Sequence, residues 1–297
     1  MESTNVNLIT LLRDRVGELC GEGNFSEALD VANAAVGKAE KELSGEVDSI
    51  EAFAAALEVR GDLLRSTGEY EKARDDYRQA IDRLEGRHDL CIQLGRLHAD
   101  LGAVHDELGN LERAIDLWIE AMQYFEKAEP PALLDVASLS NNIAYLKKSL
   151  GDVDGAENSF LKALEILHRE LGPNNDETAS VCNNLGALYL QSGYNEQARD
   201  MHLMALDARR KLFGETHIDT AQSYNNLALA LLRTGDVATA KRHFESAIGA
   251  LESCGPEAVE ELESIRDNYL DFLRRDGADA SANQVEQRIA GILAQWE

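Results

Sequence analysis

Four asparagines are the residues of this sequence whose type and spacing most suggest a chemical role. They recur at intervals of 42 residues, at Asn142, Asn184, Asn226 and Asn268. An asparagine amide offers two donors and an acceptor, so a row of them can hydrogen-bond to a peptide backbone without reading its sequence. The alternative role is structural, with the same amides bridging adjacent repeats or capping the linkers between repeats.

The sequence gives little support for a catalytic or metal-binding site. His98 and His105 lie seven residues apart and therefore share one face of a helix. No carboxylate or cysteine partner is evident for them in the sequence, which favours packing or surface roles over a metal site. The HExxH, GxSxG and glycine-rich phosphate-loop patterns are absent. We therefore expect a protein that is not an enzyme and that uses no metal or other cofactor.

The charge of the chain excludes several classes of partner. Its 297 residues include 54 Asp and Glu against 29 Lys and Arg, a formal net charge of -25. Such a surface repels nucleic-acid backbones and anionic membranes. The sequence shows no apolar run long enough to span a bilayer and no basic leader, and its 4 cysteines are far apart. Free thiols suit a reducing compartment, so we expect a cytoplasmic protein.

Internal repeats supply the elements that must position these residues. Seven glycines follow one another at intervals of 41 to 45 residues, and an alanine stands five residues after each of them. The glycines are Gly23, Gly68, Gly109, Gly151, Gly193, Gly235 and Gly277. The alanines are Ala28, Ala73, Ala114, Ala156, Ala198, Ala240 and Ala282.

One repeat shows the structure that this pattern predicts. Residues 140–150 carry apolar side chains at the 3–4 spacing of a helix, and Gly151 then supplies the left-handed conformation of a helix C-cap. Asp152 can cap the next helix, in which Phe160 lies between small alanines and fills the gap beside them. Such a hairpin cannot bury its apolar face alone, whereas stacked copies can. The sequence therefore predicts an all-α protein, an α-solenoid of stacked hairpins.

These repeats resemble the tetratricopeptide repeat. That family has a small residue in the first helix, a glycine at the turn, and Ala, an aromatic residue and Ala in the second helix. A clear copy is Ile143-Ala144, Gly151, Ala156, Phe160 and Ala163. The resemblance implies a superhelix of about seven hairpins with degenerate terminal ones, in a single domain over 1–297. The repeats are expected at about 9–43, 54–88, 95–130, 137–172, 179–214, 221–255 and 263–296.

The longer period narrows the resemblance to repeats of the kinesin light chain type. The unit is 42 residues here, against about 34 in ordinary tetratricopeptide repeats. The linkers at 171–179 and 213–221 resemble the connector of kinesin light chain repeats, and so do the asparagine pairs that follow them. Ile218 is a departure, because that family usually has proline there.

This resemblance implies where a partner binds. The first helix of each hairpin faces a concave groove, and asparagines at the positions of Asn142, Asn184, Asn226 and Asn268 contact extended peptides in the related family. The further residues expected to line the groove, each of which is also compatible with ordinary surface, are Tyr145, Lys148, Leu190, Leu229, Leu232 and Arg233. The acidic segment 252–286 has two open interpretations, a polar outer cap or a docking patch for a basic partner.

The sequence thus predicts a non-catalytic scaffold for protein–protein interaction. A chain built only of kinesin-light-chain-type repeats, without a coiled-coil segment, resembles the bacterial kinesin light chains that accompany bacterial tubulins. The resemblance implies binding to the bacterial tubulin polymer, a cytoskeletal role without a motor. The alternative is a cytosolic peptide-binding adaptor or signalling regulator that uses the concave groove.

Overall fold

Helices are the only regular elements of the residues that the structure describes. The computed structural model describes residues 4–296, with side chains from residue 11 onward except residue 88. Fourteen α-helices in this span confirm the predicted all-α fold. The first six are α1 (Thr4–Gly21), α2 (Phe25–Lys41), α3 (Val47–Ser66), α4 (Tyr70–Leu84), α5 (Cys91–Glu107) and α6 (Leu111–Lys127). The others are α7 (Leu133–Ser149), α8 (Val153–Glu170), α9 (Asp176–Gln191), α10 (Asn195–Phe213), α11 (Ile218–Thr234), α12 (Val237–Glu252), α13 (Val259–Arg275) and α14 (Asp279–Trp296).

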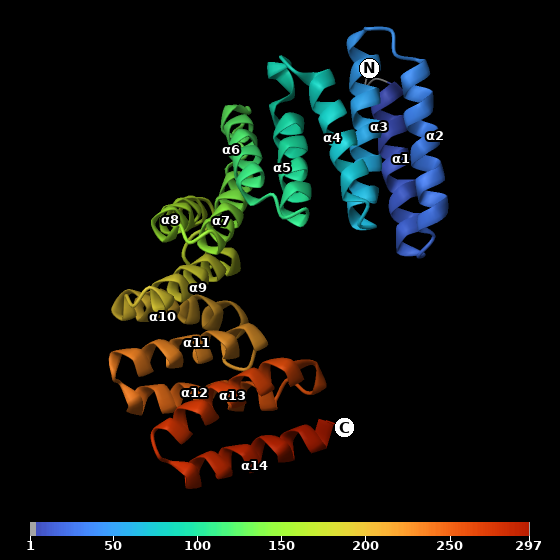
Figure 1. The fold of residues 1–297 in the computed structure, drawn as a ribbon. Coiled ribbons are helices and arrows are strands. Elements are labelled where there is room, and N and C mark those ends of the chain that lie inside the picture. Colours follow the sequence, from blue (N-terminus) through green and yellow to red (C-terminus); the bar gives the residue numbers. More distant parts are fainter. Residues whose placement is uncertain (1–3, 297) are drawn as a thin grey trace. The chain divides into compact units, whose positions relative to one another are not determined.

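Consecutive helices pair into antiparallel hairpins, each with a first and a second helix (Figure 1). Contacts divide the chain into two compact units, residues 1–139 and residues 140–297, with the boundary inside α7. In the first unit, α1 contacts α3 and α3 contacts α5, and in the second unit the same holds for α9, α11 and α13. The first helices of neighbouring hairpins therefore touch one another as well as the second helix between them. A single domain over 1–297 stays a prediction.

Glycine makes the turn inside every hairpin. All seven repeat glycines adopt positive φ angles, between 71° at Gly277 and 87° at Gly235. This region is open to glycine at little steric cost, so the predicted left-handed C-cap at Gly151 is confirmed, with φ 80°. The predicted cap of the following helix is confirmed as well, because the Asp152 carboxylate accepts a hydrogen bond from the Gly155 backbone N–H.

A small residue of the first helix lies under a ring of the second helix in the inner hairpins. A Cβ atom added to Gly102 would stand 2.5 Å from the Trp118 indole, and one added to Gly61 would stand 2.9 Å from the Tyr77 ring. Real Cβ atoms do not approach other atoms so closely, so the missing side chain is what admits the ring. The recurring small residue of the sequence pattern is therefore a packing requirement.

The first hairpin achieves the same packing with the sizes exchanged. Val16 stands where the first helices of the five inner hairpins have glycine or alanine, and Ala32 stands where their second helices have a ring. Both side chains are buried. In the last hairpin, Glu286 occupies the ring position and is exposed. The terminal hairpins are thus the atypical ones, as expected for repeats with one face unpaired.

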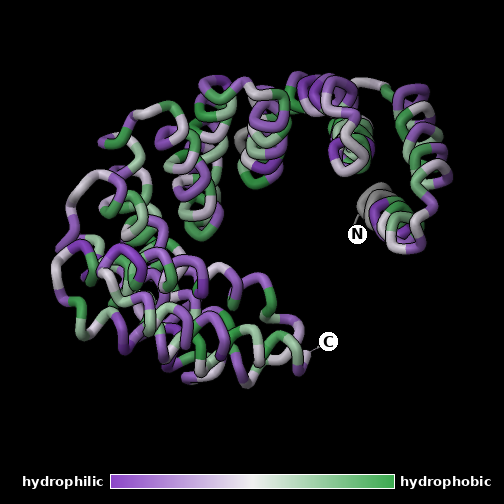
Figure 2. Tube along the Cα trace, turned by 60° about the horizontal axis from the view of Figure 1, so that its bottom comes forward, coloured by the Kyte–Doolittle hydropathy of each residue, from purple (hydrophilic) through white to green (hydrophobic). Residues whose placement is uncertain are grey.

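Hydrophobic and hydrophilic residues alternate along the helices (Figure 2). The hydrophobic side chains of α11–α14 gather in one continuous core cluster that begins with Leu206 of α10. A second large cluster joins α2 to α6 in the first unit. No described helix is long and apolar enough to cross a bilayer.

We predict that Gly102→Ala lowers the free energy of unfolding. The added methyl group must displace the Trp118 indole, an overpacking cost of about 1–3 kcal/mol. The measurement is urea unfolding followed by far-UV circular dichroism, which reports the loss of helix. Gly249→Ala is the matched control, because Gly249 is also in a helix and a Cβ there meets nothing within 4 Å. The control should gain up to about 1 kcal/mol from helix propensity. Equal effects of the two substitutions would contradict the packing argument.

Candidate functional site

The residues expected to line the groove all lie on first helices of the second unit, including Leu232 of α11. α7 carries Asn142, Tyr145 and Lys148, and α9 carries Asn184 and Leu190. α11 carries Asn226, Leu229 and Arg233, and α13 carries Asn268. We call the exposed side of these four helices the first-helix face. Its role in binding stays a proposal, developed below.

Two of the four asparagines bridge neighbouring hairpins. The Asn184 amide donates to the Asn141 Oδ1 atom at 3.0 Å, and the Asn268 amide donates to the Asn225 Oδ1 atom at 3.3 Å. We call each such contact a rung. Each acceptor stands three residues before the small residue of its helix, and each donor stands two residues before the same position, which is Gly186 in α9 and Leu270 in α13. The structural alternative for these asparagines is therefore observed at two positions, where part of the amide still remains for a ligand.

The other two asparagines form no hydrogen bond within the described residues, and both are partly exposed. For Asn226 the reason is visible in the neighbouring hairpin. The expected acceptor of its rung, the Asn183 Oδ1 atom, lies 2.9 Å from the His202 Nδ1 atom, and the Asn183 amide donates to the Ser223 hydroxyl. The complete amides of Asn142 and Asn226 are thus free to meet a partner.

The other residues expected to line the groove differ in exposure and in the chemical group that they present to solvent. Tyr145 is 42% exposed and rests edge-on against the Phe160 ring, and partial burial raises the pKa of its hydroxyl. Leu229 packs against the core cluster of α11–α14 and is partly buried, as is Leu190. Lys148 and Arg233 have no ion pair within the described residues. On α11, Asn226, Leu229 and Arg233 follow a 3–4 spacing and share one face.

A buried polar network in the fifth hairpin escaped the sequence reasoning. His202 occupies the ring position held by Phe160 and Phe244 in the neighbouring hairpins, and Arg209 stands where Leu167 and Leu251 are buried. His202 and Arg209 are only 2% and 7% exposed. The 42-residue period contains the signal, because each residue is polar at a position where both neighbouring hairpins have an apolar residue.

Hydrogen bonds to two neighbouring helices, α9 and α11, compensate the burial of Arg209. Its guanidinium donates to the Asp176 carboxylate at 3.0 Å, to the Ser180 hydroxyl at 3.0 Å and to the Asp219 carbonyl at 3.2 Å. A buried charge requires such partners, because removing it from water without them costs several kcal/mol. Burial also lowers the pKa of His202 to about 4, so its imidazole is neutral in the folded protein near neutral pH.

The histidine pair of the third hairpin requires a correction. We expected no carboxylate partner for His98, but its Nδ1 atom lies 3.0 Å from a Glu120 carboxylate oxygen of α6, and its ring stacks on Tyr124. Burial outweighs this neighbour and lowers the pKa of His98. Within the described residues, no group of three or more His, Cys, Asp or Glu side chains could hold a metal ion.

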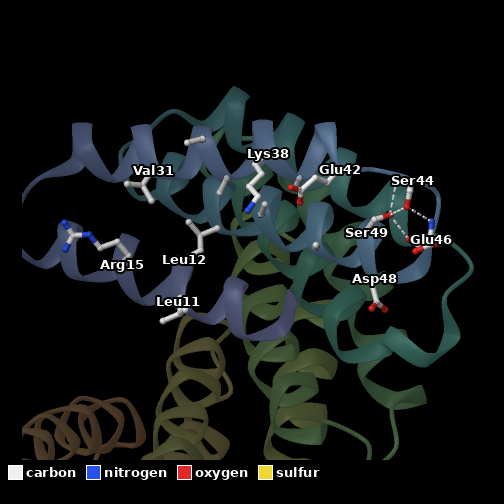
Figure 3. A pocket seen from close by; sticks show the side chains of 15 residues that line it. Leu11, Leu12, Arg15, Val31, Lys38, Glu42, Ser44, Glu46, Asp48 and Ser49 are labelled. Atoms are coloured by element: carbon white, nitrogen blue, oxygen red, sulfur yellow. Dashed lines mark hydrogen bonds between the residues drawn. The ribbon is translucent and has the colours of Figure 1, made fainter. Parts of the chain in front are cut away.

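The first unit contains a separate apolar pocket of about 700 Å³ between α1, α2 and α3 (Figure 3). Its walls are formed mainly by alanines together with Leu11, Leu12 and Val31. Arg15 lies near one end of the pocket and Glu46 and Asp48 near the other, with Lys38 and Glu42 side by side between them. The pocket offers apolar contact and no catalytic constellation.

The arginines of the acidic segment 252–286 are all ion-paired. Arg266 contacts Glu263 and Asp267, and Arg275 contacts Asp271. Arg274 contacts Glu286 at 3.0 Å. These pairs tie α13 to itself and to α14. Two further carboxylates of the segment, Glu252 and Asp276, pair with Arg288 and Lys241. Both interpretations of the segment stay open.

We predict that acid destabilises the second unit through His202. Its lowered pKa means that the unfolded chain takes up a proton at about pH 6.5, whereas the folded chain does so only near pH 4. The stabilisation is complete above about pH 6.5 and is lost as the pH falls toward 4, by about 2–3 kcal/mol. Urea unfolding of the protein and of His202→Phe at several pH values isolates this contribution. In the variant, the free energy of unfolding should no longer fall between about pH 6.5 and pH 4 by this amount. A decrease that is the same at every pH reports the loss of the hydrogen bond to Asn183. If the free energy of unfolding of the variant depended on pH as that of the wild type does, His202 would not be the source of the acid destabilisation.

Comparison with known proteins agrees with the hairpin architecture. Tetratricopeptide repeat models match residues 50–83, 135–210 and 183–253. BtubC (BKLC) from P. vanneervenii has a similar crystal structure, with 27% identity over 77% of this chain and 92% of that chain and a TM-score of 0.63. The C-terminal part of a TPR repeat-containing protein from Cytophaga hutchinsonii shares 14% identity over 94% of this chain and 95% of that one, with a TM-score of 0.67.

The apo form of RapI has a TM-score of 0.61 at 13% identity, over 97% of this chain and 99% of that chain. At such low identity, the second and third structures speak for the fold alone. No curated protein matches the sequence significantly. The repeat models and the hairpins lead to one conclusion: the chain belongs to the tetratricopeptide repeat family.

Proposed function

We propose that this tetratricopeptide scaffold binds the bacterial tubulin polymer. The observation that carries the proposal is the similarity to BtubC (BKLC). The match extends over 92% of the BtubC chain, and the two sequences are 27% identical. The kinesin-light-chain-type linkers and the 42-residue period of the sequence support it. In this role the protein is a cytoplasmic, non-catalytic scaffold, and the polymer is its partner.

The mode of binding must accommodate the charge of the chain. With a net charge of -25, the scaffold gains no long-range attraction to an acidic polymer. Short-range contacts therefore supply the affinity, through free amides, exposed apolar groups such as Tyr145, and cations without ion pairs such as Lys148 and Arg233. Salt should weaken such binding only slightly, because it also screens the repulsion between the two partners.

We predict that the folded protein pellets with bacterial tubulin polymer under polymerising conditions and stays in the supernatant without polymer. The bound fraction should saturate with protein concentration and should not collapse when the salt is raised. Sedimentation with unpolymerised tubulin is the control. Folded protein that stays in the supernatant beside polymer would sink the proposal.

A second candidate function is a peptide-binding adaptor that uses the first-helix face. The free amides of Asn142 and Asn226 favour it, because an extended peptide presents backbone donors and acceptors that such amides can satisfy. The tubulin polymer and a short peptide are different partners, so the two functions separate experimentally.

We predict that Asn226→Ala weakens peptide binding without loss of stability. The amide forms no hydrogen bond within the described residues, so its removal costs only what the ligand gains, about 0.5–1.5 kcal/mol per neutral hydrogen bond. Asn184→Ala is the matched comparison, because it also breaks the rung to Asn141 and should lower the stability of the second unit. A peptide array followed by titration of the bound peptides measures the first effect, and urea unfolding measures the second. Peptides bound equally by the wild type and Asn226→Ala would exclude this amide from the site.

A further inference from the structure

Whether a rung forms in the second unit correlates with the ring of the second helix. In the fourth hairpin the ring is Phe160, and Asn141 of α7 accepts a rung. In the sixth hairpin the ring is Phe244, and Asn225 of α11 accepts one. In the fifth hairpin the ring is His202, and the equivalent asparagine of α9 accepts no rung within the described residues. A phenylalanine ring has no hydrogen-bond donor, whereas an imidazole has at least one N–H.

Burial does not distinguish the unused acceptor from a used one. Asn183 is 9% exposed and forms no rung within the described residues, whereas Asn225 is 8% exposed and accepts from the Asn268 amide at 3.3 Å. Asn183 and Asn225 each stand three residues before the small residue of their helix. The same side chain at equivalent backbone positions, equally buried, therefore differs in its hydrogen bonds because its neighbours differ.

Both polar ends of the Asn183 amide are held by buried neighbours. Its Oδ1 atom lies 2.9 Å from the His202 Nδ1 atom, and its amide donates to the Ser223 hydroxyl at 3.2 Å. Because a carbonyl oxygen only accepts, His202 is the donor in the first contact. Close packing on α9 fixes the ring there, since a Cβ added to Gly186 would stand 2.7 Å from the His202 Cε1 atom. Asn183 is thereby kept from turning toward Asn226.

The partner of the Asn183 amide is as exceptional as the ring. Ser223 of α11 is fully buried. The equivalent residues of α9 and α13, 42 residues away in either direction, are the buried and apolar Val181 and Ile265. The rung acceptors Asn141 and Asn225 consequently meet no polar side chain at either of these two positions, and their oxygens stay available to the next hairpin.

We propose that His202 is a positioning residue, which withdraws Asn183 from the rung and so keeps the Asn226 amide available to a ligand on the first-helix face. The part of this proposal that concerns a ligand rests on the peptide-binding function proposed above. Rung and ligand compete for one amide. With phenylalanine as the ring, the amide connects two hairpins, and with histidine it faces a partner with its donors and its acceptor. A buried ring of the second helix thus sets the chemistry of the exposed first helix of the next hairpin.

A double-mutant cycle without ligand, measured by urea unfolding near neutral pH, tests the positioning role. In the wild type, Asn226→Ala should leave the equilibrium constant of unfolding unchanged. In His202→Phe, the Asn183 oxygen loses its donor, and a buried oxygen without a donor is unfavourable, so Asn183 should turn and accept from Asn226. In that variant, Asn226→Ala should raise the unfolding constant about two- to tenfold. Equal effects of Asn226→Ala in the two backgrounds would overturn the proposal.

The matched control is Asn184→Ala. Its rung to Asn141 does not involve His202, so this substitution should raise the unfolding constant by the same factor in the wild type and in His202→Phe. A factor that changed as much as that of Asn226→Ala would show a general weakening of the unit in place of a competition for one amide, and would count against the proposal.

The imidazole of the unsubstituted protein provides an independent measurement. Nitrogen NMR distinguishes the two neutral tautomers, and His202 should carry its proton on the Nδ1 atom, from which it donates to Asn183. A proton on the Nε2 atom alone would overturn the proposal, even if His202→Phe failed to fold.

Peptide titration separates the positioning role from the proposed function. If both hold, His202→Phe should raise the Kd of peptides bound by the wild type about two- to tenfold, and Asn226→Ala should add nothing further in that variant. Coupling in the unfolding cycle together with unchanged peptide binding would keep the competition for the rung and would overturn the part that concerns a ligand. Without coupling in the unfolding cycle, the positioning role fails whatever the peptides do.

Discussion

The close approach of the two helices of a hairpin is the constraint on which the rest of the structure depends. A first helix can lie against the ring of its second helix only where its own side chain is nearly absent, as at Gly102 beneath Trp118. Interiors pack at the density of organic crystals, so an extra methyl group at such a point forces the helices apart. Hairpin spacing then fixes where the first helices of neighbouring hairpins meet, and hence where their rungs form.

Polar residues between hairpins are the second element of the design. Asn184 and Asn268 connect neighbouring first helices through neutral amides. The fifth hairpin instead buries Arg209 and His202 among hydrogen-bonding partners, at positions that are apolar in both neighbouring hairpins. Buried polar groups of this kind cost stability when any partner is lost, and they favour one arrangement of the neighbouring helices over others. The hairpins therefore share one backbone plan but differ in the chemistry of the contacts between them.

The acidic surface has a limited part in this design. Most ion pairs, such as Arg274 with Glu286, involve exposed side chains and contribute little to stability in water. The first-helix face of the second unit differs, because it combines neutral amides, partly buried leucines and cations without ion pairs within the described residues. A partner that meets this face encounters hydrogen-bonding and apolar groups before it encounters the net charge. The proposed binding through this face consequently relies on shape and on direct contact.

The sequence by itself determined the hairpins, because the glycine turns, the small residues and the rings are local requirements repeated at a constant period. Gly151, Asp152 and Phe160 could each be assigned a role from spacing alone. Only the tertiary structure decided which amides form rungs and which stay free. Asn184 and Asn226 are equivalent in the sequence, but Asn183 gives its oxygen to His202, and Asn226 is left without an acceptor. The side chain of a neighbouring hairpin sets this difference, and a period along the chain cannot reveal which neighbour competes for a hydrogen bond.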